Sequence, residues 1–582
     1  IMLLAYYIAC VNIETTYQAI TRAHLKDIAD AANALGSPHE LAEGPAVEID
    51  VLYVPFPGAT LTDTFQITEE GDRADTSLIP VNNDRIEAQL AAPIKVIVGN
   101  PPYSAGQGSA NDNNANLKYP TLDRRIAETY ATLSTATNKN SLYDSYIRAI
   151  RWASDRIGDY GIVAFVSNNG WVDGNTADGI RKTFQTEFSD VYVYNLRGNQ
   201  RTAGEQSRQE GGKVFGSGAR TGVAVLIAVK RRERSATTQA RVHYFAVPNY
   251  QTAEDKLARI NASTLSHTPW QALTPNEAGD WLNQRDDTFA AFQPIGTKDS
   301  TDTDVPHFAL FSAGLKTNRD AWCYNFATAA VEANMRRMIA TYNSQAITCQ
   351  GSDSHLDRDP TKISWSRGLV SDALRGRTHG FNGERVYRSL YRPFTPQHAY
   401  FDRPLNDMVY RQESIFPTPH HRNMGMLVTA PHLQADGTTL MTDCLPDVAT
   451  YTITAQFFPR WTYEKASGPA TVSGNGQESL LEAASTGSAS GDVDEWGYRR
   501  VDNITDGILA LYREKFGASV SKDDVFYYVY GVLHSEQYRN TFAADLKRML
   551  PRIPLAATTS DFVAFVDAGR KLADLHVNYE TV

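Results

Sequence analysis

Asn100, Pro101, Pro102 and Tyr103 form the segment whose residue types are best suited to chemistry. The side-chain carbonyl of Asn100 and the main-chain carbonyl of Pro101 are two acceptors that can take both hydrogens of an exocyclic amine. The amine nitrogen would then point its lone pair at an electrophilic methyl group, while Tyr103 would offer a ring on which a base can stack. Catalysis would rest on positioning and electrostatics, since the amine becomes acidic only after attack. The same tetrapeptide is also compatible with a turn that ends a strand.

The elements around this motif are expected to place it at the edge of a sheet. A short apolar strand is predicted at 94–99, directly before Asn100. Further strands are predicted at 47–54, 161–166, 191–196 and 221–229, and an amphipathic helix at 142–157. Strands separated by helices indicate an α/β fold with a mainly parallel, doubly wound sheet, which binds ligands at the carboxyl ends of its strands. The last two strands lack a clear helix between them, so we expect an antiparallel pair at the sheet edge.

The composition is that of a globular protein with several domains. The 582 residues exceed one hydrophobic core, and the net charge of −10 gives no overall basic signature, although a local basic cleft would still allow nucleic-acid binding. The four cysteines form no CxxC pair, which is typical of reduced thiols in a cytoplasmic protein. His420, His421 and His432 lack a recognised ligand spacing, so no metal site is predicted.

The N-terminal segment carries apolar residues at helical spacing. They are Leu3, Leu4, Tyr7, Ile8 and Val11. The segment has no basic flank, and Asn12 and Glu14 interrupt it, so we predict one buried helix of a soluble domain rather than a membrane anchor.

The strand–NPPY–helix–strand series resembles the N6-adenine and N4-cytosine DNA methyltransferases, whose signature is (D/N/S)PP(Y/F/W) with Asn favouring adenine. The resemblance implies a class I, Rossmann-like methyltransferase sheet, with S-adenosylmethionine as methyl donor and a flipped adenine gripped by Asn100 to Tyr103. It places Asp63, in TLTDTFQ, near the adenine of S-adenosylmethionine. It also places Asn168 and Trp171 along the base pocket.

Longer stretches resemble one family over nearly the whole chain, the single-chain type I-like ("type ISP") restriction-modification enzymes, with a gamma-like motif order. Among these stretches are VPFPGATLTDTFQ, GDWLNQRDD, GLKTNRDAWCYNF and YRPFTPQHAYFD. The resemblance implies a nuclease and a helicase-like ATPase upstream in the same polypeptide. It also implies a glycine-rich S-adenosylmethionine loop, which this sequence lacks, so we expect an N-terminally truncated fragment that is inactive in isolation.

Several polar residues are candidates for contact with double-stranded DNA. GLKTNRDAW contributes Lys316, Asn318 and Arg319, and the row ERVYRSLYRPF, read with helical spacing, contributes Arg388 and Arg392. Asn199 and Arg201 follow a predicted strand at the expected base-facing rim. From composition alone, the same residues fit solvated loops with ordinary salt bridges equally well; the resemblance favours DNA.

The sequence predicts three regions along the chain. A methyltransferase domain is predicted at 1–232, a mixed α+β target-recognition domain at 233–500 with a flexible insertion at 467–492, and a helical segment at 501–582. The expected function is adenine-N6 methylation of DNA at a specific site. One alternative is a non-catalytic specificity module that directs an attached nuclease and ATPase, and another is an RNA or protein amino-methyltransferase.

Overall fold

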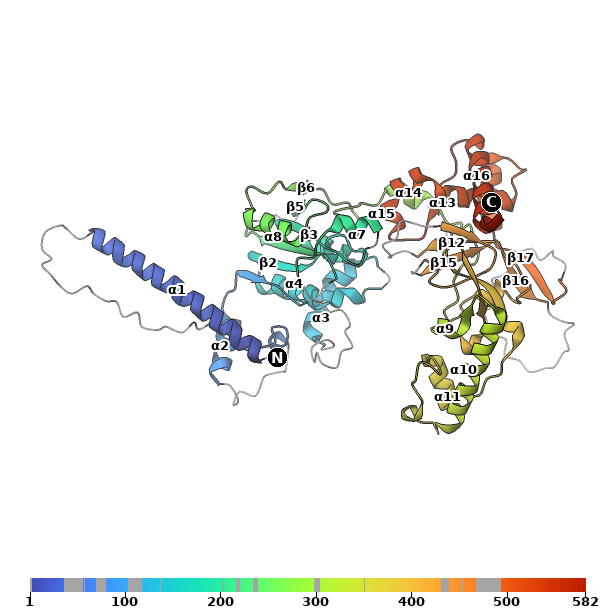
Figure 1. Ribbon diagram of the computed structural model, residues 1–582. Helices are drawn as coiled ribbons and strands as arrows, with labels where there is room; N and C mark the ends of the chain where they lie inside the picture. Colours follow the sequence, from blue (N-terminus) through green and yellow to red (C-terminus); the bar gives the residue numbers. More distant parts are fainter. Residues whose placement is uncertain are drawn as a thin grey trace, which may run out of the picture. The chain divides into compact units, whose positions relative to one another are not determined.

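The computed structural model describes most of the chain in two compact units. The described residues are 3–35, 56, 58–69, 80–102, 118–136, 138–202, 204–215, 220–233, 239–297, 304–349, 351–430, 439–451, 454–466 and 493–581. Unit 1 is Ile1–Leu282 and unit 2 is Asn283–Val582, and each is described by itself (Figure 1). Tyr103, His432, the predicted strand 47–54 and the predicted insertion 467–492 lie outside the described residues.

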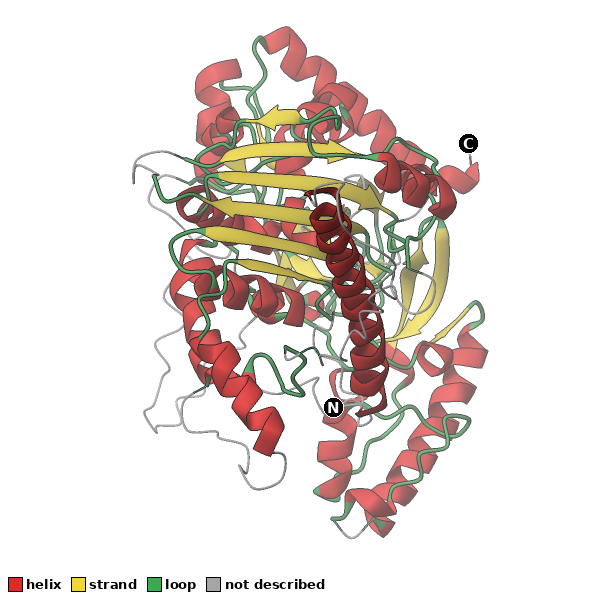
Figure 2. Cartoon of the chain, turned by 90° about the vertical axis from the view of Figure 1, so that its left-hand side faces the viewer, coloured by secondary structure: helices red, strands yellow, loops and turns green. Residues whose placement is uncertain are grey.

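Unit 1 is built on a six-stranded sheet with the order β1-β2-β4-β3-β5-β6 (Figure 2). Its strands are β1 (Val96–Gly99), β2 (Gly161–Asn168), β3 (Asp190–Arg197), β4 (Val223–Lys230), β5 (Arg241–Ala246) and β6 (Gln271–Leu273). β1 runs parallel to β2 and β3 parallel to β5, whereas β4 is antiparallel to both β2 and β3. The expected antiparallel pair is therefore present. Its position at the sheet edge was predicted wrongly, because β4 inserts between β2 and β3.

The helices of unit 1 are α1 (Leu3–Leu35), α2 (Pro80–Ala91), α3 (Pro120–Ile126), α4 (Ser145–Arg156), α5 (Gly170–Asp173), α6 (Asp178–Glu187), α7 (Gly204–Glu210) and α8 (Ala253–Ala262). α4 begins where Asp144 accepts the backbone N–H of Tyr146, an ordinary N-cap. Its apolar face joins the inward residues of β2 and β3 in one buried cluster. In α1, Val11 is 64% exposed, so the predicted burial is not observed at that residue.

The sheet of unit 1 continues beyond the predicted domain boundary at residue 232. β5 pairs with β3 and β6 pairs with β5. The boundary of the compact unit therefore falls fifty residues later, after Leu282.

Unit 2 contains two four-stranded sheets, with the orders β14-β10-β11-β9 and β13-β12-β15-β8. The strands of the first are β9 (Tyr324–Asn325), β10 (Val386–Arg392), β11 (Thr395–Tyr400) and β14 (Leu445–Pro446). Those of the second are β8 (Ser312–Ala313), β12 (Gly425–Thr429), β13 (Thr439–Thr442) and β15 (Ala455–Pro459). Two-stranded pairs are formed by β16 (Trp461–Lys465) with β17 (Tyr498–Asp502), and by β7 (Gln293–Pro294) with β18 (Arg552–Ile553).

Two hydrophobic clusters hold unit 2 together. One surrounds α10 (Thr328–Thr348), with α9 (Asp320–Cys323) and α11 (Arg367–Leu374) beside it. The other joins the second sheet to the helices α12 (Asp506–Phe516), α13 (Lys522–His534), α14 (Glu536–Thr541), α15 (Ala543–Leu546) and α16 (Thr559–Val577). A Cβ on Gly569 would lie 2.0 Å from the carbonyl oxygen of Tyr527, so glycine is required where α13 and α16 pack closely. The residues predicted as a helical C-terminal segment thus share a core with a sheet.

None of the helices in the described part of the chain is long and apolar enough to cross a membrane.

Candidate functional site

The Asn-Pro-Pro motif lies at the carboxyl end of β1, as the sequence predicts. β1 pairs with β2 in parallel up to Gly99, which faces Phe165. Asn100 is exposed, Pro101 is buried and Pro102 is exposed. Because β2 and β3 run in the same direction as β1, Asn168 and Arg197 end their strands at this same edge of the sheet. In open α/β sheets, ligands bind beyond the carboxyl ends of the parallel strands, and this edge holds those ends of β1, β2 and β3.

A chain of side-chain hydrogen bonds runs along this edge and was not predicted. The amide of Asn169 donates to Asn195 Oδ1 at 3.2 Å, and the amide of Asn195 donates to the hydroxyl oxygen of Tyr244 at 3.0 Å. Burial raises the pKa of Tyr244, so its hydroxyl stays neutral. A Cβ on Gly222 would lie 2.4 Å from the amide nitrogen of Asn169, which explains glycine there. Asn169, directly after β2, and Asn195, on β3, are brought together by the strand order, which the sequence alone does not reveal.

Trp171 is a core residue and not, as predicted, a residue that lines a base pocket. Its side chain is 0% exposed and packs against Phe184 and Trp281, with ring centroids 5.8 and 6.0 Å away. Its indole N–H donates to Ser167 Oγ at 3.1 Å. A ring enclosed in this way has no face left for a base. Asn168, by contrast, is half-buried and accepts the backbone N–H of Gly170 at 2.8 Å.

Asp63 caps a short turn. Its Oδ1 accepts the backbone N–H groups of Phe65 and Gln66 at 3.0 and 3.3 Å, and its Oδ2 accepts the hydroxyl of Tyr119 at 2.9 Å. Burial, followed by this hydrogen bond to Asp63, raises the pKa of Tyr119. Both carboxylate oxygens therefore have partners within the chain, and contact between Asp63 and a cofactor stays a prediction.

The loop after β3, which carries Asn199 and Arg201, is held by hydrogen bonds from a buried lysine. Asn199 Oδ1 accepts the backbone N–H of Arg201 at 3.0 Å, and Arg201 is exposed. The Nζ of Lys256, a fully buried residue, donates to the carbonyl oxygens of Glu210 and Gly212 at 2.8 and 2.7 Å. These bonds hold the end of the loop in place. Nothing in its local sequence distinguishes Lys256 from a surface lysine.

In unit 2, the predicted contact residues Lys316, Asn318 and Arg319 differ in their exposure to solvent. Asn318 is exposed and Lys316 is half-exposed. Arg319 is only 2% exposed, so its predicted contact with DNA is wrong. Its guanidinium donates to the carbonyl of Ser364 at 3.2 Å, to the hydroxyl of Ser366 at 2.7 Å and to the carbonyl of Leu405. This arginine joins segments of the fold.

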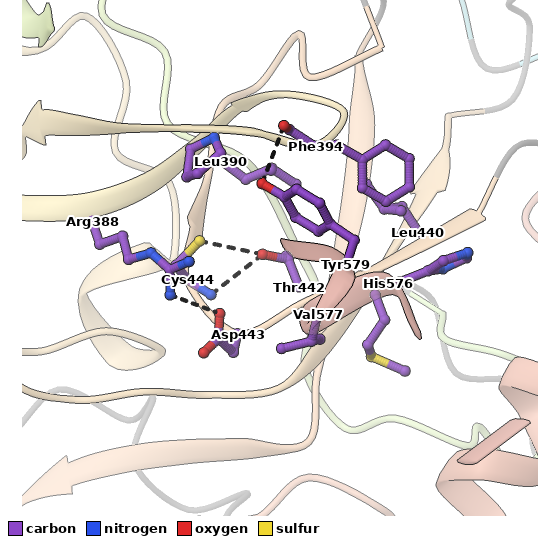
Figure 3. A pocket seen from close by; sticks show the side chains of 12 residues that line it. Arg388, Leu390, Phe394, Leu440, Thr442, Asp443, Cys444, His576, Val577 and Tyr579 are labelled. Carbon is purple, nitrogen blue, oxygen red and sulfur yellow. Dashed lines mark hydrogen bonds and ion pairs between the residues drawn. The ribbon is translucent and has the colours of Figure 1, made fainter. Parts of the chain in front are cut away.

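Arg388 and Arg392 lie on the strand β10, which corrects the helical spacing read from the sequence. The guanidinium of Arg392 stacks over the Tyr391 ring at 3.9 Å and pairs with Asp447 at 3.0 Å. Arg388 lies 3.6 Å from Asp443 and borders a cavity shared with Cys444, His576 and Tyr579 (Figure 3). This cavity has a volume of about 20 Å³, which is enough for one water molecule and too small for an organic ligand.

The comparisons with known proteins decide the family. Residues 306–582 match the family model of the Type ISP C-terminal specificity domain. A nuclease-deletion mutant of the Type ISP restriction-modification enzyme LlaGI, solved in complex with a DNA substrate mimic, is 36% identical with a TM-score of 0.75. The chain belongs to the Type ISP restriction-modification family. The ATP-dependent Type ISP enzyme LlaBIII, solved bound to DNA, is 34% identical with a TM-score of 0.76. DrdV, solved in a complex with DNA, is 32% identical with a TM-score of 0.72. No curated protein matches the chain.

The chain spans less than half the length of these Type ISP enzymes and of DrdV. The matches cover 100%, 100% and 91% of this chain, but only 41%, 34% and 49% of LlaGI, LlaBIII and DrdV. The Type ISP specificity domain begins at residue 306, well after the boundary at 233 predicted for target recognition. The residues between them complete the sheet of unit 1 or begin unit 2.

No group of three or more His, Cys, Asp or Glu residues that could hold a metal ion occurs among the described residues of this Type ISP chain. His421 pairs instead with Asp494 at 2.8 Å, and the ring of His420 stacks on Trp496 with centroids 5.2 Å apart.

Proposed function

We propose that this chain is the DNA-modifying and DNA-reading section of a Type ISP enzyme. In this proposal unit 1 transfers a methyl group from S-adenosylmethionine to N6 of a flipped adenine, and the specificity domain selects the duplex site. The observation that carries the proposal is the position of Asn100 and Pro101, whose carbonyl groups follow a parallel strand at the ligand-binding edge of the sheet. The common direction of β1, β2, β3 and β5, with β4 antiparallel between β2 and β3, supports a Rossmann-like methyltransferase sheet.

The residues present fit the amine that such a reaction requires. The exposed Asn100 side chain would accept one amine hydrogen, and the Pro101 carbonyl would accept the other, which leaves the nitrogen lone pair free to attack. S-adenosylmethionine supplies a methyl group on a positively charged sulfur. Transfer of this methyl group would form a nitrogen–carbon bond at the amine as the carbon–sulfur bond breaks, and the methylated amine would then lose one proton to solvent. No residue has to act as a strong base, so positioning supplies most of the rate enhancement.

Binding to duplex DNA is proposed for the specificity domain on two grounds. The relatives LlaGI, LlaBIII and DrdV were all solved with DNA or a DNA mimic. The net charge of −10 means that local cations must supply the phosphate contacts. Binding that depends on such local Lys and Arg residues releases counterions and therefore weakens steeply as salt rises.

A second candidate function is a specificity module without catalysis of its own. The family model that matches this chain covers the specificity domain, residues 306–582, and that observation favours this candidate. The two candidates differ in one respect only, the transfer of a methyl group to DNA.

Replacement of Asn100 by alanine in the full-length enzyme separates the two. Asn100→Ala removes one of two acceptors that hold the target amine, and we expect methyl transfer to fall by two to three orders of magnitude, about 3 kcal/mol at the transition state. A labelled-methyl assay measures this, and a salt titration of duplex binding should be unchanged by the substitution. The exposed Asn578, on the last turn after α16, provides the control variant Asn578→Ala. Near-normal transfer by Asn100→Ala would refute the role of Asn100.

A further inference from the structure

Two loops of the specificity domain lie side by side and are joined like two short strands. They comprise residues 314–319 and 406–412 and are called the paired loops below. The backbone N–H of Lys316 donates to the carbonyl of Met408, and the N–H of Met408 donates back, both at 2.9 Å. The Lys316 ammonium pairs with the Asp407 carboxylate at 3.0 Å. The lysine therefore serves first to fasten one loop to the other.

The first of the paired loops is held by alternate buried residues. Leu315, Thr317 and Arg319 are 0%, 1% and 2% exposed. Arg319 also donates to the carbonyl of Leu405, directly before the second loop. A Cβ on Gly314 would lie 2.5 Å from the backbone of Asp447, so the loop begins where only glycine fits.

The second of the paired loops is held in the same manner. Asn406, Val409 and Gln412 are 5%, 3% and 0% exposed. The Asn406 amide donates to the carbonyl of Tyr400 at 3.1 Å, and the Gln412 amide donates to that of Ala313 at 2.9 Å. Because these buried residues anchor the backbones of both loops, the side chains between the anchors leave the backbone in fixed directions.

The residues between the anchors face solvent. Asn318 and Arg411 are exposed, and Met408 and Tyr410 are 49% and 38% exposed. Asn318 and Tyr410 have φ angles of 54° and 47°, in the left-handed region that a bulky side chain such as tyrosine seldom adopts. Backbone strain of this kind persists only where surrounding structure enforces it, and it clusters at ligand-contacting sites. The paired loops thus present an amide, a thioether, a phenol and a guanidinium to solvent from fixed backbones.

We propose that the paired loops read base edges in duplex DNA and help to set the sequence specificity of the enzyme; this inference rests on the proposed DNA-reading function of the domain. Asparagine suits the paired donor and acceptor of adenine, arginine the two acceptors of guanine, and an apolar side chain the methyl group of thymine. Asn318, Arg411 and Met408 supply these three chemistries. Tyr410 lies between Met408 and Arg411 and adds a ring whose direction its backbone fixes.

DNA is chosen over a protein partner because the relatives LlaGI, LlaBIII and DrdV were solved with DNA or a DNA mimic. The paired loops combine hydrogen-bonding groups of three kinds on fixed backbones. Fixed polar groups of differing chemistry serve recognition by hydrogen-bond pattern, whereas general attraction to phosphate requires only unpaired cations.

The test is selection of binding sites from a randomised duplex library by the full-length enzyme. The wild type is compared with Met408→Ala, Tyr410→Ala and Arg411→Ala, and Tyr410→Phe keeps the ring as the conservative variant. Leu575→Ala is the matched control, because Leu575 is 45% exposed on α16. That helix packs on β13, at the opposite edge of the sheet from β8, which precedes the first loop. Thermal melting checks that each variant is folded.

We expect at least one alanine variant to relax the selected motif at one or two base positions, with preference for the correct base falling about tenfold. Its affinity for DNA without the site and its salt dependence should match those of the wild type and of Leu575→Ala. An unchanged motif in all three alanine variants would overturn the inference, as would an equal loss of affinity for every sequence. If the wild type binds but selects no motif, or binds no duplex, the proposed function itself fails.

Discussion

At the scale of single residues, His307 shows how burial couples protonation to folding. The residue is 0% exposed, and its Nδ1–H donates to the carbonyl of Pro294 at 3.0 Å. Its Nε2 accepts the hydroxyl of Tyr512, also at 3.0 Å. Both ring nitrogens are thus satisfied in the neutral form, and burial lowers the pKa of His307 to about 4.

The contribution of His307 to the stability of unit 2 should fall as pH decreases from about 6.5 to 4, because the unfolded chain binds a proton at His307 that the folded chain does not. The full effect is roughly 3 kcal/mol. Asp447 acts in the opposite direction, since burial raises its pKa to about 6, so it stabilises at low pH and loses that contribution as pH rises through 6. Urea unfolding across this pH range should therefore be compared between wild type and His307→Gln. Parallel pH profiles for the two proteins would contradict the prediction.

The sequence shows where polar and aromatic residues cluster along the chain, but it does not show which of their side chains are exposed to solvent. Asn100 was placed correctly at the end of a strand, because an apolar run followed by two prolines fixes that boundary. Trp171 and Arg319 were not, because the residues that enclose them, Trp281 and the carbonyl of Leu405, are distant in sequence. Burial of a polar or aromatic residue is a tertiary property, and the local spacing around it does not encode that.

At the scale of elements, β1 is an edge strand with an uncovered apolar face. Among the described residues it pairs with β2 alone. Val96 and Val98 are 59% and 75% exposed, and Ile162 beside them on β2 is 36% exposed. An exposed apolar edge strand is a site of association through strand pairing.

Replacement of Val98 by lysine should reduce aggregation of the chain without lowering its melting temperature by more than about 1 °C, because an exposed surface substitution changes stability little. The matched variant is Val163→Lys on the neighbouring strand, where the side chain is 1% exposed and a charge would be buried. Light scattering and thermal melting at fixed ionic strength measure both effects. Equal destabilisation by the two substitutions would show that Val98 is covered in solution.

Most elements of unit 1 were predictable, and their order was not. The strands β2, β3 and β4 and the helix α4 lie within a few residues of the predicted ranges, because their apolar periodicity is clear. The insertion of β4 between β2 and β3 depends on pairing between distant strands. Arg388 and Arg392 were predicted on a helix because a spacing of four residues fits the periodicity of a helix as well as that of a strand. Pairing with β11 and β14 places them on the strand β10.

At the scale of the whole molecule, the functions of the two units rest on different kinds of observation. Each hydrophobic cluster lies within one unit, and the family match falls within unit 2. The family match identifies the specificity domain, whereas the proposal of methyl transfer by unit 1 rests on the position of the motif after β1. The predicted boundary at 232 failed because composition changes at a basic cluster there, while the sheet continues beyond it.

The most direct test of methyl transfer is the chemical identity of the product made by the full-length enzyme that contains this chain. Unmethylated duplex DNA is incubated with S-adenosylmethionine carrying an isotopically labelled methyl group, digested to nucleosides and analysed by mass spectrometry. We predict label in N6-methyladenine with the wild type and none with Asn100→Ala. Label in N4-methylcytosine, or no label in DNA that the enzyme binds specifically, would contradict the proposal.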